Sequence, residues 1–233
     1  MNINGVDIGR GSPPYCVAEL SGEHNGQIDN ARALIAAAKD AGADAAKLQV
    51  FDWVTLANQR GGRHKTIDWQ GQLFTLGELY KRTRTPVRWL PELFDYAKNL
   101  RITLFSSVFD GSSYHLDVLN KLGCPAFKVA SREAADVGLV TAAAKTGKPL
   151  IISTGTATDD ELGRSIAEAA KHTNQIALLY CVSEYPTPMG SLDFDEIKFL
   201  RRRFQLPVGF SDHTVGIEAA VEAVKAGACI IEK

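Results

Sequence analysis

Lysines and small hydroxyl residues recur at the ends of the apolar runs of this sequence. The lysines are Lys47, Lys128 and Lys233, and the accompanying serines are Ser107, Ser131, Ser153, Ser183 and Ser211. Ammonium groups that converge in one cavity repel each other unless an anion lies among them. Serine hydroxyls beside them can donate hydrogen bonds to phosphate or carboxylate oxygens. These residue types predict a pocket for a small, doubly anionic substrate such as a phosphorylated acid.

Four further residues could carry acid–base, metal or binding chemistry. Glu19 and Glu133 are candidate general bases, although carboxylates that pair with lysines in a structural network would have the same sequence pattern. His213 is a candidate metal ligand, but a divalent site needs three or four ligands, so the residues alone favour a structural histidine. Gln49 follows Lys47 at the end of the same apolar run and is counted with the substrate-binding residues.

A different chemistry would use the same lysines. A lysine at a strand end, beside carboxylates, can form a Schiff base with a carbonyl substrate, and Lys47, Lys128 and Lys233 are all placed for it. Composition does not separate such an aldolase from an anion-binding site. Strict alternation along a strand would put Lys128 and Ser131 on opposite faces, so they share a site if the strand bends at its end.

Hydrophobic periodicity predicts the elements that must position these residues. Short β-rich runs occur at residues 15–20, 45–50, 102–107, 126–131, 149–154, 176–181, 207–210 and 228–232, and seven helical stretches lie between them. In one stretch Asp29 is the predicted N-cap and Gly42 ends the helix, as Gly147 and Gly227 end two others. This alternation indicates a parallel sheet, and eight strands favour a closed (β/α)8 TIM barrel. The chemistry of such a barrel collects at the carboxyl ends of its strands.

We expect residues 1–233 to form a single barrel that lacks its last helix. Apolar surface on the first and eighth strands would then be uncovered, so we expect the sequence to be part of a longer protein or to be completed by another chain. A long connection at about residues 52–90 interrupts the alternation and is rich in Lys and Arg. It predicts either an anion-attracting lid over the site or a solvated surface excursion.

Composition argues against several classes of protein. The formal net charge of −1 offers no basic field for nucleic acid. No apolar run reaches the ~20 residues of a membrane helix, and the N-terminal residues lack the regions of a signal peptide. The four cysteines are isolated, with no C-x-x-C pair, which predicts reduced thiols in a cytoplasmic protein.

Several longer motifs carry a resemblance to a known family. They are VAELSGEHNG, GADAAKLQVF, CPAFKVASREAADVGLV, GKPLIISTGTAT, SEYPTP and VGFSDHTVGIEAAVEAVKAGACIIEK. In this order, over nearly the whole chain, they resemble the sialic acid synthases, which make N-acetylneuraminate, legionaminate and pseudaminate. The resemblance implies a metal-dependent barrel that condenses phosphoenolpyruvate with an N-acetylated hexose and releases phosphate to give a nonulosonic acid. The stretch LGELYKRTRTPVRWLPELF looks more like the pseudaminate and legionaminate branches.

The resemblance also implies roles for individual residues. The implied contacts of phosphoenolpyruvate are Lys47, Ser107, Lys128, Ser131, Ser153, Ser183 and Ser211. Tyr185 would lie near the sugar or the phosphate, and Glu19 and Glu133 would be acid–base or substrate-binding carboxylates. His213 would be one ligand of a divalent metal, Mn²⁺ with Mg²⁺ or Co²⁺ as alternatives. The implied assembly is a homodimer.

The sequence departs from the family pattern at a few positions. Arg132 takes the place of a glycine, Glu23 takes the place of an asparagine, and the second metal-binding histidine and the C-terminal antifreeze-like domain are absent from the sequence. These departures support a rival hypothesis, a non-catalytic barrel that binds phosphoenolpyruvate or a sugar. The other rivals are the Schiff-base aldolase and the synthases that make octulosonate or heptulosonate phosphates.

Overall fold

Eight parallel strands form the centre of the molecule. The computed structural model describes residues 1–69, 71–109 and 113–233. The barrel strands are β3 (Tyr15–Glu19), β4 (Ala45–Val50), β7 (Thr103–Val108), β8 (Phe127–Val129), β9 (Leu150–Ser153), β10 (Ile176–Tyr180), β11 (Val208–Ser211) and β12 (Ile230–Glu232). They pair in sequence order, and β12 pairs with β3, so the barrel is closed. The predicted TIM barrel is therefore confirmed.

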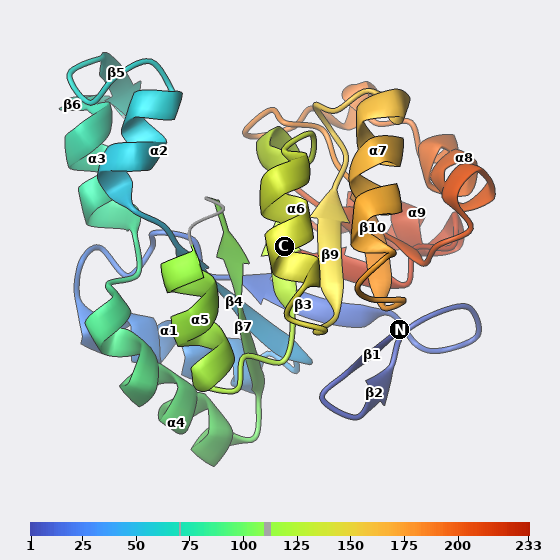
Figure 1. Ribbon diagram of the computed structural model, residues 1–233, viewed down its shortest axis with the longest axis horizontal. Helices are drawn as coiled ribbons and strands as arrows, with labels where there is room; N and C mark the ends of the chain where they lie inside the picture. The colour runs from blue at the N-terminus through green and yellow to red at the C-terminus, as the bar shows by residue number, and fades with distance from the viewer. Residues whose placement is uncertain (70, 110–112) are drawn as a thin grey trace.

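Helices on the outside connect successive strands (Figure 1). They are α1 (Ile28–Asp40), α4 (Leu90–Leu100), α5 (Ser113–Lys121), α6 (Val137–Ala144), α7 (Asp159–Ala169), α8 (Asp195–Phe204) and α9 (Glu218–Lys225). Gly42, Gly147 and Gly227 follow three of these helices with positive φ, as predicted. The prediction that Asp29 is an N-cap is wrong, because α1 begins at Ile28 with Gln27 at the cap, and Asp29 lies in the first turn.

An N-terminal hairpin, which the periodicity did not predict, lies at the amino end of the barrel. It pairs β1 (Asn2–Ile3) with β2 (Val6–Asp7), and its Ile3 side chain is fully buried. Asn2 N donates to Gln175 Oε1 just before β10, and Asn4 Nδ2 donates to Thr103 Oγ1 at the start of β7. The hairpin therefore covers the barrel end opposite the predicted site.

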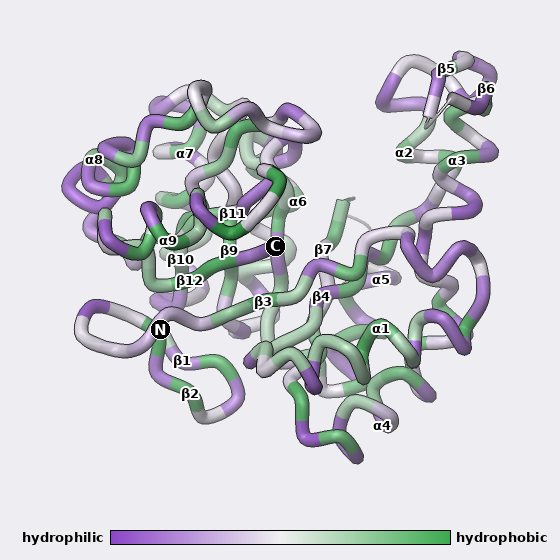
Figure 2. The backbone as a smooth tube through the Cα atoms, turned by 180° about the vertical axis from the view of Figure 1, so that it is seen from behind, coloured by the Kyte–Doolittle hydropathy of each residue, from purple (hydrophilic) through white to green (hydrophobic). Residues whose placement is uncertain are grey.

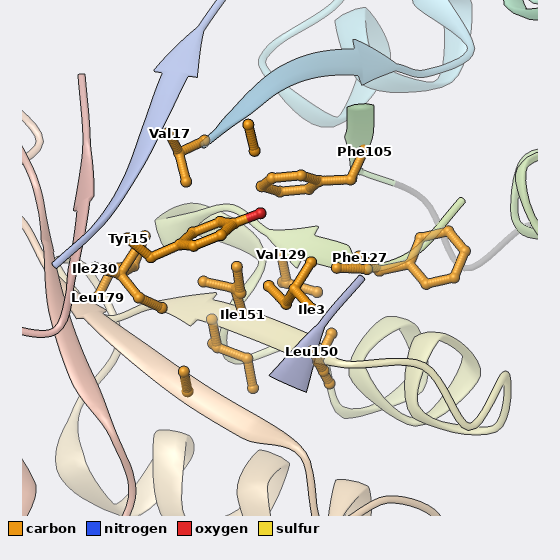
Figure 3. Packing of buried hydrophobic residues seen from close by; sticks show 14 of the residues in the cluster. Ile3, Tyr15, Val17, Phe105, Phe127, Val129, Leu150, Ile151, Leu179 and Ile230 are labelled. Carbon is orange, nitrogen blue, oxygen red and sulfur yellow. The ribbon is translucent and has the colours of Figure 1, made fainter. Parts of the chain in front are cut away.

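Apolar side chains fill the interior. Figure 3 shows Tyr15, Val17, Phe105, Ile151 and Ile230 pointing toward one another from strands on different sides of the barrel. Because side chains alternate between the two faces of a strand, the residue two positions further along each strand faces inward again. The apolar layer thus determines which residues stand at the carboxyl end of the interior.

The long connection between β4 and α4 contains its own secondary structure. It consists of α2 (Trp53–Gln59), β5 (Thr66–Trp69), β6 (Gln72–Thr75), α3 (Leu76–Thr83) and a 3-10 helix (Val87–Trp89). We call residues 53–83 the arm. Figures 1 and 2 show α2, α3 and the β5–β6 hairpin standing away from the barrel, with strongly hydrophilic segments among them. The outer half of the arm is therefore a surface excursion, while its base starts at the carboxyl end of β4.

Apolar surface is uncovered on one side of the barrel. Cys16 on β3 is exposed, and Ile217, Val221 and Val224 line an exposed stripe at helical spacing along α9. On β12, by contrast, Ile231 is buried, so the expected exposure falls on β3 and α9 rather than on the eighth strand. Across the described ranges, none of the helices is long and apolar enough to cross a membrane.

Replacing Gly209 on β11 with alanine is expected to destabilise the barrel. A Cβ atom there would lie 2.4 Å from the carbonyl oxygen of Ile230, so β12 would have to move. Overpacking costs about 1–3 kcal/mol, and the free energy of unfolding in urea should fall by that amount. The control Gly190→Ala, where an added Cβ meets nothing within 4 Å, should change it by less than about 0.5 kcal/mol. Equal stability of the two variants would contradict the close approach of β11 and β12.

Candidate active site at the carboxyl end of the barrel

A ring of polar side chains stands directly above the apolar layer. Each polar residue stands two positions after an inward-facing residue of its strand. The pairs are Val17 and Glu19, Phe105 and Ser107, Ile151 and Ser153, Gly209 and Ser211, and Ile230 and Glu232. Because side chains alternate between the two faces of a strand, these polar side chains also face the barrel interior. The predicted residues of four different strands are thus brought to one end of the barrel interior.

Glu232 lies between two buried lysines. Its Oε1 atom is 2.9 Å from Lys128 Nζ and also accepts a hydrogen bond of 2.9 Å from Ser211 Oγ. Its Oε2 atom is 3.6 Å from Lys47 Nζ. Since β8 and β12 are not neighbours in the barrel, the contact with Lys128 crosses the interior. The lysines of the predicted pocket therefore already have an anion among them.

Lys47 has two further partners in this cluster. Its Nζ donates to Ser107 Oγ at 2.9 Å and forms an ion pair with Glu19. Glu19 Oε1 also accepts a hydrogen bond from the backbone N–H of Ser21. The two lysines and the carboxylates of Glu19 and Glu232 have formal charges that cancel, so the cluster is neutral overall when every member is ionised.

Burial and mutual charge shift the pKa values of this cluster. Burial lowers the pKa of Lys47 to about 7, and the charge of Lys128 lowers it too, while Glu232 opposes both. Burial alone would raise the pKa of Glu232, but the charges of Lys128 and Lys47 outweigh it and lower the pKa to about 2. Glu232 is therefore a permanent anion at neutral pH, and Lys47 exchanges its proton near neutrality.

Hydroxyl groups gather beside Lys128, above β8 and β9. Strand β8 ends at Val129, and the chain turns into a 3-10 helix (Ser131–Glu133), which supplies the bend that the sequence required. Ser131 Oγ lies 3.2 Å from both Thr156 Oγ1 and Ser183 Oγ. Ser153 Oγ is buried and has no hydrogen-bond partner among the described residues. The hydroxyl of Ser153 could therefore donate to an oxygen of an anion, and Ser131 and Ser183 could exchange their mutual hydrogen bond for one to the same anion.

Glu133 is held by a residue of the arm. Arg60, the C-cap of α2, forms an ion pair with Glu133 Oε1, although the two residues are 73 positions apart in the sequence. Glu133 Oε2 is buried and has no partner within the part of the chain that the structure describes. The C-terminal end of α2 thus borders the site, which favours the lid interpretation for this part of the connection.

His213 is fixed in one tautomer by its neighbours. Its Nδ1 atom lies 2.8 Å from the carbonyl oxygen of Val182, which can only accept, so Nδ1 carries the proton and Nε2 offers a lone pair. Burial lowers the pKa of His213, which keeps the ring neutral at pH 7. Asp212 supports this loop: its Oδ1 accepts from Thr214, and its Oδ2 accepts from Lys233 Nζ at 2.8 Å.

The geometry of His213 suits one metal ligand, because a neutral imidazole with its other nitrogen hydrogen-bonded is the form that binds divalent ions. Across residues 1–69, 71–109 and 113–233, however, no group of three or more His, Cys, Asp or Glu side chains could hold a metal ion. His213 is therefore a single candidate ligand, and the described residues do not complete a divalent site.

Three predicted site residues, Gln49, Tyr185 and Lys233, have their contacts outside the cluster of Lys47, Lys128 and Glu232. Gln49 Nε2 donates to the carbonyl oxygen of Thr83 at 3.3 Å, so this amide ties β4 to the arm. Tyr185 is 72% exposed, and its ring lies 4.2 Å from that of His213. Lys233 pairs with Asp212 and also donates to the carbonyl oxygen of Thr214. These contacts place Gln49 and Lys233 in supporting positions and Tyr185 at the rim.

Two charged residues of the site were not among those predicted. Glu232 could have been found from its place two residues after the inward-facing Ile230, at the end of the eighth strand. Arg60 gives no such signal, because its position depends on the path of the arm and not on a local pattern.

Comparisons with known proteins show the family of this chain. The model of the NeuB family matches residues 34–233, and the chain belongs to this family of sialic acid synthases. It is 39% identical over 227 residues to the pseudaminic acid synthase of Helicobacter pylori, with 95% of this chain covered. It is 34% identical over 226 residues to the N,N'-diacetyllegionaminic acid synthase of Campylobacter jejuni, with 93% of this chain covered.

A crystal structure of the N-acetylneuraminic acid synthetase of Leptospira borgpetersenii in complex with citrate superposes with a TM-score of 0.89 and 30% identity, covering 100% of this chain and 76% of that one. The chain covers 65% of the length of the Helicobacter synthase and 66% of the Campylobacter synthase. It thus spans less than two thirds of these curated relatives.

Replacing Glu232 with glutamine should strongly destabilise the protein. The substitution leaves two buried ammonium groups without the carboxylate they share, and such a loss costs about 3–5 kcal/mol. We expect the free energy of unfolding at pH 7 to fall by that amount in urea titrations. The difference from wild type should shrink by pH 9, because Lys47, with a pKa of about 7, has then lost its charge in the folded state.

The control for this substitution is Glu222→Gln. Glu222 is a partly exposed residue of α9 whose carboxylate pairs with Lys225 at 2.7 Å. Such surface pairs are worth about 0–1 kcal/mol. A Glu232→Gln variant as stable as this control would contradict a shared counter-ion role for Glu232.

Proposed function

We propose that the protein is a synthase that condenses phosphoenolpyruvate with an N-acetylated amino sugar and releases phosphate. The product would be a nonulosonic acid of the sialic, pseudaminic or legionaminic type. Membership of the NeuB family and the names of the relatives support this class of product. The octulosonate and heptulosonate phosphate synthases are less favoured, because the family match is to the sialic acid synthases.

The observation that carries the proposal is the group of donors around Lys128. Its ammonium group is buried on β8, and the hydroxyl of Ser153, which has no partner among the described residues, ends the adjacent strand. The hydrogen-bonded hydroxyls of Ser131 and Ser183 follow β8 and β10 at the same end of the barrel. Such a group suits an anion with several oxygens, such as a phosphate. Lys47, which donates to Ser107, would meet the carboxylate end of phosphoenolpyruvate, and Ser211, which donates to Glu232, would lie beside it.

The chemistry of the reaction assigns tasks to these residues. C3 of phosphoenolpyruvate forms a bond to the aldehyde carbon of the open-chain sugar, whose oxygen takes up a proton. Water adds at C2, and phosphate leaves as the C2–O bond breaks. Lys47 and Lys128 would balance the negative charge of the substrate, and the hydroxyls would orient its phosphate. Glu19 and Glu133 are the carboxylates proposed to bind the sugar or move its protons.

A divalent metal belongs to this proposal through His213. We propose that Nε2 of His213 gives one ligand to Mn²⁺, with Mg²⁺ or Co²⁺ as alternatives. Such an ion would supply Lewis acidity when bound. A homodimer in the cytoplasm is the proposed form of the protein, and the four free cysteines agree with that compartment.

One observation favours a second candidate function. Lys47 has a pKa of about 7, and a lysine that is neutral near pH 7 can attack a carbonyl carbon to form a Schiff base. Borohydride treatment in the presence of substrate would then inactivate the protein and add mass to Lys47. Full activity after borohydride would exclude this aldolase mechanism.

The proposed reaction predicts that phosphate release requires three components together: phosphoenolpyruvate, an N-acetylated hexose and a divalent metal. Lys128→Met should lower the rate at least about 100-fold, since it removes a donor to developing charge in a buried site. Lys145→Met, on the exposed end of α6, is the matched control and should leave the rate within about twofold. A colorimetric phosphate assay with a panel of N-acetylated hexoses measures both, and circular dichroism checks that the variants fold.

Release of phosphate without a sugar, or in the presence of a chelator, would contradict the proposed mechanism. Tight binding of phosphoenolpyruvate in calorimetry, with no turnover of any sugar, would favour the non-catalytic barrel.

A further inference from the structure

The arm contributes one charged group that the barrel strands cannot supply. The side chain of Arg60 is 20% exposed and that of Glu133 is 8% exposed, so their ion pair is largely shielded from water. Shielded pairs of this kind hold their geometry and are screened little by salt. Arg60 also stands at the carboxyl end of α2, where a positive charge is favoured by the helix dipole.

This pair leaves the two oxygens of Glu133 in different situations. Oε1 is held by the guanidinium of Arg60, while the buried Oε2 has no partner within the described ranges. A guanidinium bound to one carboxylate oxygen restricts rotation of the whole carboxylate, so the direction of the other oxygen is fixed as well. An oriented, unpartnered carboxylate oxygen in a site is an acceptor for a hydroxyl or an amide N–H of a ligand.

We propose that Arg60 is a positioning residue for the sugar: it holds Glu133 so that Oε2 accepts a hydrogen bond from a hydroxyl or N-acetyl N–H of the sugar. The inference rests on the proposed function, in which Glu133 belongs to the sugar-binding half of the site. The arm would therefore contribute to binding of the sugar and would not contribute to binding of phosphoenolpyruvate.

The charges that face Glu133 come from three elements. Arg60 belongs to the arm, at the C-terminal end of α2, Arg132 precedes Glu133 in its own 3-10 helix, and Lys128 stands on β8. Burial raises the pKa of Glu133, and Arg60 is the strongest of the charges that oppose the rise. Loss of Arg60 should therefore leave Glu133 protonated to a higher pH, and a protonated Oε2 is a poorer acceptor.

The test compares Arg60→Ala and Arg60→Lys with the control Arg63→Ala. Arg63 is an exposed arginine of the same arm, and its Nε contacts the ring of His64. We expect Arg60→Ala to raise the KM for the sugar about tenfold, the size of a lost hydrogen bond to a charged group, with the KM for phosphoenolpyruvate within about twofold. Arg60→Lys should recover part of the loss, and Arg63→Ala should match wild type.

The pH profile distinguishes positioning from a general loss of structure. In Arg60→Ala the acid limb of kcat/KM for the sugar should move to higher pH, because Glu133 then gains its proton earlier as the pH falls. In a Glu133→Gln background, Arg60→Ala should add little further loss. A tenfold rise in the KM for phosphoenolpyruvate instead would mean that Arg60 binds that substrate, and it would overturn the proposal.

A second measurement does not depend on turnover. In protein labelled with ¹³C at glutamate side chains, the carboxyl resonance of Glu133 reports its pKa directly, and Arg60→Ala should raise that pKa. An unchanged pKa would overturn the positioning role whatever the kinetics. If Arg60→Ala raises the pKa of Glu133 but the wild-type protein turns over no sugar, the proposed function would be refuted. The interaction between Arg60 and Glu133 would still be confirmed.

Discussion

The shared counter-ion Glu232 is the interaction on which the site depends. Two ammonium groups inside a barrel lose most of their hydration, and they remain there because Glu232, together with Glu19 and the hydroxyl of Ser107 at Lys47, replaces the water. Glu232 lies on β12, the strand that closes the barrel against β3. Closure of the barrel and assembly of the charged cluster are therefore the same event, because Lys128 has its buried counter-ion when β12 has taken its place beside β3.

The same cluster determines how an anion could enter. With Glu19 and Glu232 present, the lysines are already neutralised, so a doubly charged substrate would bring excess negative charge into a buried site. Lys47 offers a way to balance it, since its pKa of about 7 leaves part of its population unprotonated at neutral pH. An arriving anion would raise that pKa and draw a proton onto Lys47. Burial thus leaves Lys47 able to respond to the charge of a ligand.

The barrel and much of its polar ring could be predicted from the sequence, because their signals are local. Each strand is a short apolar run, and the residue types at its end stand out against it. The β1–β2 and β5–β6 hairpins have strands of two and four residues, too short for a periodic signal. The hydrogen bond from Gln49 to Thr83 and the ion pair between Arg60 and Glu133 depend on the tertiary fold of the arm. No residue spacing in the sequence predicts that fold.

The site therefore divides into two parts with different structural origins. The Lys47, Lys128 and Glu232 cluster stands on strands whose register is determined by the packed interior, so changes there disturb the barrel itself. Glu133, by contrast, is oriented by Arg60 from an arm that stands away from the barrel, where substitutions cost the core little. If the first part binds phosphoenolpyruvate and the second binds the sugar, the sugar can be exchanged without rebuilding the barrel. A family whose members are named for pseudaminic, legionaminic and neuraminic acids is consistent with that division.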